Sequence, residues 1–353
     1  MSATSSVRRR SRTHRITRLV ASAATVAAVF TFAAPAAADT WVADGQPVLI
    51  IGDPPATFIT LPPSVDGRQQ LPDSTPVGVI SLPSKTLTGA QTITTRVSNV
   101  RIEGAVTVAA GGILENSVVV GDGVTQKALV TILDGGLVQD VTIRPQNPNQ
   151  HIDGVRMAGG TLLRSRISHV GDGIGLIRST AVVDHNWVSD LVLLSPDPGR
   201  VNDHSHDDVI QIHGGTGHRI TYNRLDATFT TAYGDAGKPV TRDSNGILTG
   251  GNPRFPQTQA MSAIMFNNIT SFPDKLTVTN NWVSGGAAAF NLGGLGAGNN
   301  AVTGYTLGTV TDNVFTPDQG NHPKLAAIGN PVIPVSWARN TYTDGTEARI
   351  TKG

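Results

Sequence analysis

Residues 209–225, Val209-Ile-Gln-Ile-His-Gly-Gly-Thr-Gly-His-Arg-Ile-Thr-Tyr-Asn-Arg-Leu225, contain three short segments in which apolar and polar residues alternate. A glycine-rich turn separates the first segment from the second, and Asn223 separates the second from the third. Alternation with a period of two is typical of β-strands with one buried face. The stretch therefore predicts three short strands that meet at two bends.

The part of this stretch around Asn223 recurs along the chain. An apolar residue, two variable residues, a small polar residue, one variable residue and a second apolar residue occur around Asn116, Asp140, Ser165, Asn186, Asn223, Asn281, Asn313 and Asn340. Successive polar positions are 24, 25, 21, 37, 58, 32 and 27 residues apart, which indicates a repeat interrupted by insertions. Such repeats are typical of solenoids. We expect each Asn to adopt the left-handed backbone conformation of a bend and to hydrogen-bond along the stack.

These repeats predict an all-β protein with a single-stranded right-handed parallel β-helix over residues 91–353. After residue 38, no segment keeps apolar residues at helical spacing over three turns without glycine or proline. Residues 39–90 are rich in proline, and we expect them to form an irregular N-terminal segment that caps the first coil. The chain has no cysteine, so no disulfide supports this fold.

Residues 1–38 have the composition of a signal peptide. They contain six arginines, no acidic residue, an apolar run from Leu19 to Ala34, and the sequence Ala36-Ala-Ala38 before Asp39. Because the whole chain has 27 Lys and Arg against 26 Asp and Glu, cleavage near Ala38 leaves a net charge of about −5. We therefore expect a secreted, monomeric protein with no membrane span and no nucleic-acid partner.

The densest polar cluster follows the first of two long insertions, which cover residues 189–205 and 226–259. The cluster starts at Asn202 and includes the candidate site residues His204, His206, Asp207, Asp208, Gln211 and His213. Insertions in a solenoid usually collect on one face, where they wall a groove. Adjacent acids beside a histidine suit general acid–base chemistry, so this cluster is the candidate catalytic site.

Aligning the strands places Asp153, Asp172 and Asp208 at one position of successive coils, with His151 and His206 two residues before two of them. Parallel strands stack about 4.8 Å apart, so these carboxylates should raise one another's pKa unless a cation lies between them. The column therefore suits either acid–base work or binding of Ca²⁺. Aspartate before glycine is also a common turn residue, which leaves backbone capping as the alternative for Asp153 and Asp172.

Gln211 and Arg156 are predicted to point outward from these strands. There they could hydrogen-bond sugar hydroxyls or a carboxylate, or else remain solvated surface residues. Further candidates for substrate binding flank the column, namely His151, His204 and His213. His218 on the following strand is expected to be structural. The His-Ser-His sequence at 204–206 is a weaker candidate for Zn²⁺, because no other residues complete a tetrahedral site.

These strands resemble the pectate-lyase-like superfamily of right-handed parallel β-helix proteins over roughly residues 90–345. The resemblance is closer to exported actinobacterial right-handed β-helix repeat proteins with a His-Asn-Asp-Gly-Ile-Gln strand. In this chain that strand is His206-Asp-Asp-Val-Ile-Gln211, so Asp207 and Val209 replace the Asn and the Gly. The adjacent aspartates also resemble the pair in polygalacturonase-type hydrolases, whose Gly-His-Gly and Arg-x-Lys motifs are missing here.

The lyase members of this superfamily imply Ca²⁺ on the aspartate column and a basic residue as catalytic base. In this chain Arg156 and Arg178 are the candidates for that base. The fold resemblance supports a carbohydrate polymer as substrate more strongly than it supports a bond type.

Two functions follow from these observations. The first is an enzyme, a polysaccharide lyase or glycoside hydrolase, that cleaves an extracellular polysaccharide. In it Asp208 is the principal acid or base, Asp207 and Asp172 assist or bind a cation, and His206 positions them. The alternative is a non-catalytic β-helix that binds a glycan or cell-wall polymer as an adhesin or scaffold. The polar cluster beside the longest insertions favours the enzyme, because a spacer does not need it.

Overall fold

The computed structural model describes residues 58–59, 75–76, 78–79, 81, 83–121, 128–146, 152–194, 205–227, 229–233, 239–242, 248–249, 262–267, 273–286, 288–294, 307–315, 324–327 and 335–349. The predicted signal peptide, His151 and His204 lie outside the described residues. Across these ranges the chain forms strands and turns without a helix. Accordingly, the described part contains no helix of the length and hydropathy needed to cross a bilayer.

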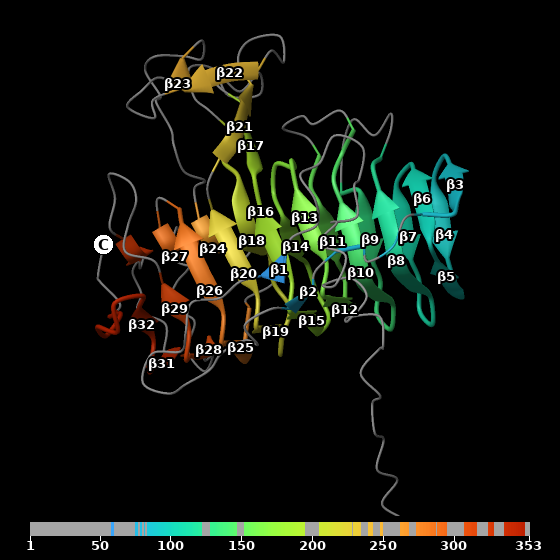
Figure 1. Cartoon of the computed structure of the whole chain (residues 1–353). Coiled ribbons are helices and arrows are strands. Elements are labelled where there is room, and N and C mark those ends of the chain that lie inside the picture. The colour runs from blue at the N-terminus through green and yellow to red at the C-terminus, as the bar shows by residue number, and fades with distance from the viewer. Residues whose placement is uncertain are drawn as a thin grey trace, which may run out of the picture.

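The strands stack in parallel into three sheets that run along the molecule (Figure 1). Sheet 1 contains β5 (Arg96–Ser98), β12 (Gly160–Leu163), β15 (Ala181–Asp184), β19 (Arg219–Thr221), β25 (Leu276–Thr279), β28 (Gly308–Thr311) and β31 (Val335–Ala338). Sheet 2 contains β3 (Lys85–Thr88), β6 (Val100–Glu103), β13 (Arg166–Ser168), β16 (Trp187–Ser189), β20 (Arg224–Ala227), β26 (Trp282–Gly285), β29 (Val314–Phe315) and β32 (Thr341–Tyr342). The longer β8 (Ile113–Val119) and β10 (Leu137–Ile143) belong to both sheets.

Sheet 3 completes each coil. It contains β4 (Gln91–Ile93), β7 (Val106–Val108), β9 (Val130–Ile132), β11 (Val155–Met157), β14 (Ile174–Leu176), β18 (Asp208–Ile212), β24 (Ser262–Asn267), β27 (Ala288–Gly294) and β30 (Lys324–Ala327). The chain passes from sheet 1 through a bend to sheet 2, round a corner to sheet 3, and back to sheet 1 one coil further on. The predicted all-β parallel β-helix is therefore confirmed.

The interior of the tube is filled by apolar side chains at alternate strand positions. Residues in register on successive coils stack on one another in sheet 1 (Leu162, Val183, Ile220, Val278, Val310), sheet 2 (Ile167, Val188, Leu225, Val283, Phe315) and sheet 3 (Ile174, Ile210, Ile264, Phe290). All of these side chains are at most 2% exposed. Burial of each contributes about 1.5–3 kcal/mol, which explains how the chain folds without disulfides.

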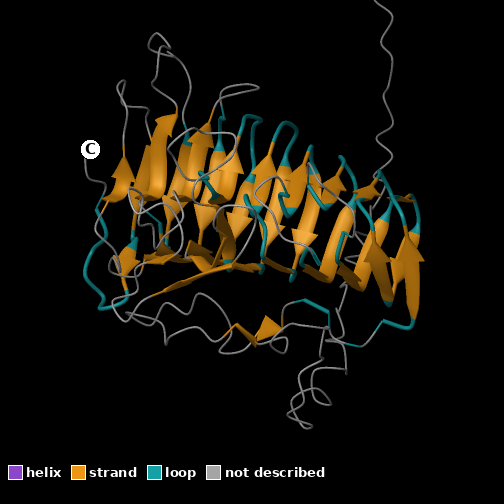
Figure 2. Cartoon of the chain, turned by 90° about the horizontal axis from the view of Figure 1, so that it is seen from above, coloured by secondary structure: helices purple, strands orange, loops and turns teal. Residues whose placement is uncertain are grey.

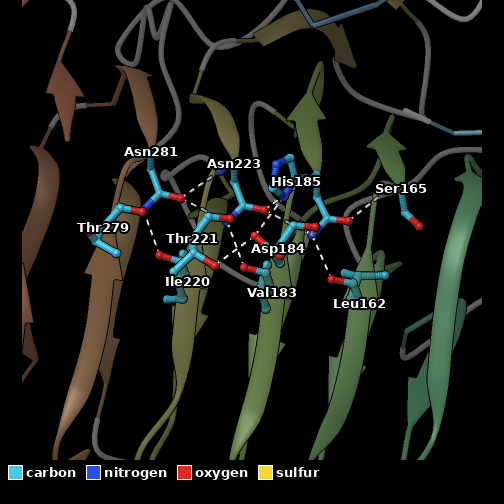
Figure 3. A network of polar contacts seen from close by, with 11 residues as sticks. Leu162, Ser165, Val183, Asp184, His185, Ile220, Thr221, Asn223, Thr279 and Asn281 are labelled. Carbon is cyan, nitrogen blue, oxygen red and sulfur yellow. Dashed lines mark hydrogen bonds and ion pairs between the residues drawn. The ribbon is translucent and has the colours of Figure 1, made fainter. Parts of the chain in front are cut away.

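A buried column of asparagines holds the bend between sheets 1 and 2, and Figure 3 shows part of it. Asn186, Asn223, Asn281, Asn313 and Asn340 are at most 1% exposed. Oδ1 of each of the last four accepts the backbone N–H and the Nδ2–H of the preceding asparagine, at 2.8 and 3.0 Å for Asn223 and Asn186. Oδ1 of Asn186 accepts the backbone N–H of Ser165 at 2.8 Å. The predicted side-chain ladder is therefore present.

The predicted backbone conformation of these asparagines is wrong. The left-handed φ belongs to the residue before each of them, namely His185, Tyr222, Asn280, Asp312 and Arg339. At Asn116 and Asp140 the polar residue itself has a positive φ, so the predicted alignment is one residue early there, and Ser117 and Val141 occupy the ladder position. The inward position suits an amide, because its Nδ2 satisfies carbonyls that the bend leaves without strand partners.

Both long insertions leave the solenoid at the corner between sheets 2 and 3. The regions expected as loops contain strands: β17 (Leu191–Leu194) pairs in parallel with β21 (Phe229–Tyr233), and β22 (Pro239–Arg242) and β23 (Leu248–Thr249) extend this small sheet. These strands project beyond one side of the coils (Figure 1). The corner beside them is where the strands of sheet 3 begin.

The N-terminal residues 78–79 lie against the side of the solenoid. Gly78 N donates to Arg164 O at 2.9 Å, and Val79 N donates to Thr142 Oγ1 at 3.0 Å. Val79 is fully buried in a small apolar cluster with Val118 and Val120. The antiparallel pair β1 (Phe58–Ile59) and β2 (Thr75–Pro76) also runs along one side of the strand stack (Figure 2). The parallel stack itself begins at β3, within the range expected for the N-terminal segment.

Candidate functional site

The structure aligns the three aspartates of the predicted column. Val155, Ile174 and Ile210 are in register on β11, β14 and β18, and an aspartate stands two residues before each of them. Backbone hydrogen bonds continue this register, since Gly154 N donates to Asp172 O and Gly173 N donates to Asp208 O, both at 2.9 Å. Asp153, Asp172 and Asp208 therefore occupy one position of successive coils, at the corner from which the insertions emerge.

The residues after these aspartates show which way the carboxylates point. A Cβ at Gly154 would lie 2.5 Å from Ile167 Cγ2, and a Cβ at Gly173 would lie 2.6 Å from Val188 Cγ1, so both positions face the packed interior. The preceding Asp153 and Asp172 are partly exposed and so lie toward the surface of the corner, whereas Asp208 is buried. The Asp-Gly pairs that the sequence shows are explained by the core, because the interior has no room for a side chain at the glycine.

Asp172 accepts a backbone hydrogen bond from the next coil, and its pKa is raised. Its Oδ1 accepts the backbone N–H of Asp208 at 2.8 Å, which is the capping role considered for this column. Burial raises the pKa of Asp172 well above its ordinary value, and the charges of Asp208, Asp153 and Asp207 raise it further. The side chain nevertheless keeps partial exposure to solvent. Asp172 therefore holds a proton more tightly than an ordinary aspartate does.

Asp208 is the more deeply buried member, at 2% exposure. Its Oδ2 accepts a hydrogen bond from Gln211 Nε2 at 3.1 Å, and its carboxylate also interacts with the backbone and hydroxyl of Ser262. Burial raises the pKa of Asp208 to about 7, although the bonds from Gln211 and Ser262 lower it. Within the described residues Oδ1 is buried without a hydrogen-bond partner. Near neutral pH this group can therefore both give and take a proton.

The other acidic and histidine residues of the cluster immediately precede β18. Asp207 is 3% exposed and accepts a hydrogen bond from Ser205 Oγ at 2.6 Å. Its negative charge adds to the rise in the pKa of Asp172, so it belongs electrostatically to the column. His206 is partly exposed beside it. The structure thus brings His206 and the two adjacent aspartates to the start of one strand.

Two predicted binding residues share the outward row of sheet 3. Arg156 and Gln211 are in register with Gly175, one on each neighbouring coil, and Arg156 is exposed. The ring of His213 lies near this row, where burial and the charge of Arg156 lower its pKa. A neutral imidazole is thus expected at neutral pH. Arg178 follows the opposite end of β14 from Asp172, so the structure does not bring it to the column.

His218 has the structural role that the sequence predicted. It is fully buried, its Nδ1 accepts the backbone N–H of Ala181 at 3.1 Å, and its Nε2 donates to Gly214 O at 2.7 Å. Both ring nitrogens are thereby used to hold the turn between sheets 3 and 1.

Sequence reasoning missed two residues of this site. Ser262 is in register with Asp208 on the next coil, and Asn291 Nδ2 donates to Ser262 Oγ at 3.2 Å from the coil after that. Their strands were aligned with β18 in the sequence, but their apolar character hid the polar positions. Aligning β24 and β27 residue by residue with β18 would have placed Ser262 above Asp208.

The sequence predicts Ca²⁺ on the aspartate column. Among the described residues, no three His, Asp or Glu side chains are arranged to hold a metal ion. One oxygen of Asp172 is already used by the backbone of Asp208. Binding of Ca²⁺ by the column stays a prediction.

Comparison of the chain with protein-family models, with curated proteins and with solved structures gives no match. The proposal for the function therefore rests on the chemistry of the aspartate column.

Proposed function

We propose that this protein is secreted and cleaves an extracellular polysaccharide, with Asp208 as the principal general acid or base. The observation that carries the proposal is the buried Asp208 carboxyl at the start of β18, whose pKa is raised to about 7 and so lies in the working range of an acid–base catalyst. It lies at the one corner of the solenoid where both long insertions emerge. Resemblance to the pectate-lyase-like superfamily points to the same class of substrate.

Asp208 would transfer the proton, and Asp172 would act on it through its charge. Gln211 donates to Asp208 Oδ2, and Oδ1 is buried without a hydrogen-bond partner among the described residues, so Oδ1 is the oxygen that we assign to proton exchange. In hydrolysis, protonated Asp208 would give its proton to the glycosidic oxygen as the C–O bond breaks, and water would form the new bond to the anomeric carbon and release a proton to solvent. In elimination, ionised Asp208 would remove the proton next to a uronic carboxylate, a C=C bond would form as the C–O bond breaks, and the departing oxygen would take a proton from water. In either reaction Asp172 would modulate the charge of Asp208.

The residues beside the aspartates suit a sugar chain. Arg156 and Gln211 offer hydrogen-bond donors on the two coils that flank Gly175, and the His213 ring lies close to Gly175. Carbohydrate hydroxyls require such donors and acceptors at regular spacing. The outward row of a parallel sheet supplies one side chain every strand spacing, about 4.8 Å.

A non-catalytic, glycan-binding scaffold remains the second candidate. The observation in its favour is the hydrogen bond from Asp208 N to Asp172 Oδ1, because a carboxylate that caps the next coil has a role without catalysis. The two functions differ in whether product is released.

The decisive experiment is an assay for products with Asp208→Asn. Wild-type protein incubated with pectate, alginate, arabinan or mixed-linkage glucan, with and without Ca²⁺, should release reducing ends from at least one polymer. Ultraviolet absorbance of the product then separates elimination from hydrolysis. Asp208→Asn should lower the rate by about 100-fold or more, because the amide cannot exchange a proton.

Asp312→Asn is the matched control for this assay. Asp312 is an outward aspartate at a bend, paired with Arg339 at 2.6 Å and far along the chain from the column. Its variant should keep wild-type activity. Full activity in Asp208→Asn would reject Asp208 as the acid or base, whereas binding of a polymer without any product would favour the scaffold.

A further inference from the structure

Asp208 and Ser262 occupy the same position on successive coils of sheet 3. Ser262 on β24 is in register with Asp208 on β18, and Ala288 on β27 follows in the same column. Asp208 is 2% exposed and Ser262 is 0% exposed, so bulk water does not reach either side chain. Their polar groups therefore depend on one another and on the side chains beside them for hydrogen bonds.

The hydrogen bonds of Ser262 have a direction. Asn291 Nδ2, on the coil after Ser262, donates to Ser262 Oγ at 3.2 Å. The single hydroxyl proton of Ser262 has two acceptors beside it, the Asp208 carboxylate and Met265 Sδ, which lies 4.0 Å from Oγ. A thioether sulfur is a weak acceptor, whereas a bond to an ionised carboxylate is strong. The hydroxyl therefore donates to Asp208, and a donor chain runs from Asn291 through Ser262 to Asp208.

The two sides of Asp208 differ in their electrostatic character. In the described part of the chain, the titratable groups on its own strand start and on the preceding coils are Asp153, Asp172, His206 and Asp207. The following coils present the neutral donors Ser262 and Asn291 instead. Burial raises the pKa of Asp208 to about 7, and the bonds from Gln211 and Ser262 lower it. Without these donors, Asp208 would keep its proton to a higher pH.

We propose that Asn291 is a positioning residue for Asp208 and acts on it through Ser262, an inference that rests on the function proposed above. By donating to Ser262 Oγ, Asn291 orients the hydroxyl as a donor and strengthens its bond to Asp208, since hydrogen bonds in a chain polarise one another. The ionised carboxylate gains more from this bond than the neutral acid does. Asn291 thus sets, from two coils away, the pH at which Asp208 changes between acid and base.

The test is urea unfolding as a function of pH for the full chain and for the variants Ser262→Ala and Asn291→Ala. In the wild type the fall in stability with rising pH should level off near the folded pKa of Asp208, about 7. Loss of the donor chain raises that pKa, so the fall should continue to a higher pH. We expect the levelling-off to move up by about one pH unit in Ser262→Ala, which loses the bond itself, and by about half a unit in Asn291→Ala.

Two controls separate the donor chain from packing. Met265→Leu removes the other acceptor beside Ser262 and should leave the levelling-off pH unchanged. In an Asp208→Asn background, Asn291→Ala should no longer alter the shape of the pH profile, because the titrating group is absent. A loss of stability in Asn291→Ala that is equal at every pH would overturn the proposal and assign Asn291 to packing, and so would an unchanged profile.

An activity profile keeps this proposal distinct from the proposed catalysis. If Asp208 is the acid or base, the pH dependence of kcat/KM should move up by the same interval as the unfolding profile. A shifted unfolding profile in a protein that cleaves none of pectate, alginate, arabinan and mixed-linkage glucan would support the donor chain and reject only the catalysis. Cleavage combined with an unshifted unfolding profile would support the catalysis and reject the donor chain.

Discussion

Asn223→Ala is expected to lower the free energy of unfolding by about 3–5 kcal/mol, because the substitution leaves several buried polar groups without partners at once. Asn223 Oδ1 accepts two hydrogen bonds from Asn186, and its Nδ2 donates to Val183 O and Thr221 O at 2.9 and 3.0 Å. Bulk water does not reach this side chain, which is 0% exposed. Urea unfolding followed by circular dichroism measures the loss.

Asn223→Ser is the matched variant, because the chain itself uses serine at this position of other coils. Ser117 Oγ accepts the backbone N–H of Val100, and Ser165 Oγ accepts that of Val141, both at 3.2 Å. Serine at 223 should therefore keep the bond to the Asn186 backbone and lose about half as much stability as alanine. Equal stability of the alanine variant and the wild type would show that the ladder does not hold the coils.

The stability of the protein should fall as pH rises, because of Asp208. Its pKa is about 7 in the folded chain, against 3.8 for an ordinary aspartate, so the folded state binds the proton more tightly than the unfolded state. The stabilisation is complete below the unfolded pKa and is lost as pH rises through the folded pKa. Between pH 5 and pH 8 we expect a loss of about 2–3 kcal/mol from this group.

Urea unfolding at both pH values, for wild type and Asp208→Asn, isolates this contribution. The variant should lose much less stability over the same interval. Its amide oxygen can still accept from Gln211, and its neutral charge also relieves the rise in the pKa of Asp172. Asp344→Asn is the control, because hydrogen bonds from Thr346 lower the pKa of Asp344 and this group stays ionised throughout the interval. If the free energy of unfolding changed with pH in the same way for the wild type and Asp208→Asn, the raised pKa of Asp208 would be rejected.

The sequence predicted the fold well because each coil carries its own signal. Alternation of apolar residues marks the strands, and the polar bend positions recur often enough to reveal the repeat. The pattern did not predict which residue of each bend takes the left-handed φ. Whether Asn186 or His185 takes the left-handed φ depends on which of them packs inward against the neighbouring coils, and both residue types tolerate that conformation.

The candidate site was predictable in its position and less so in its parts. The column Asp153, Asp172 and Asp208 followed from aligning strands, because register in a parallel stack is set by the apolar pattern. Ser262 was missed, because a long insertion separates it from Asp208 and the apolar character of its strand drew no attention to a polar position.

What the sequence by itself determined is the set of local patterns: strand periodicity, the repeat, the corner that carries the insertions, and the alignment of the aspartates. Only the tertiary structure decided the chemistry of that alignment. The pKa of Asp208 rises because neighbouring coils remove water from it, and its two oxygens differ because Gln211 donates to one of them. Desolvation and hydrogen bonding depend on atoms that the fold brings together from different coils. The residue pattern of one strand therefore does not predict the pKa of its aspartate.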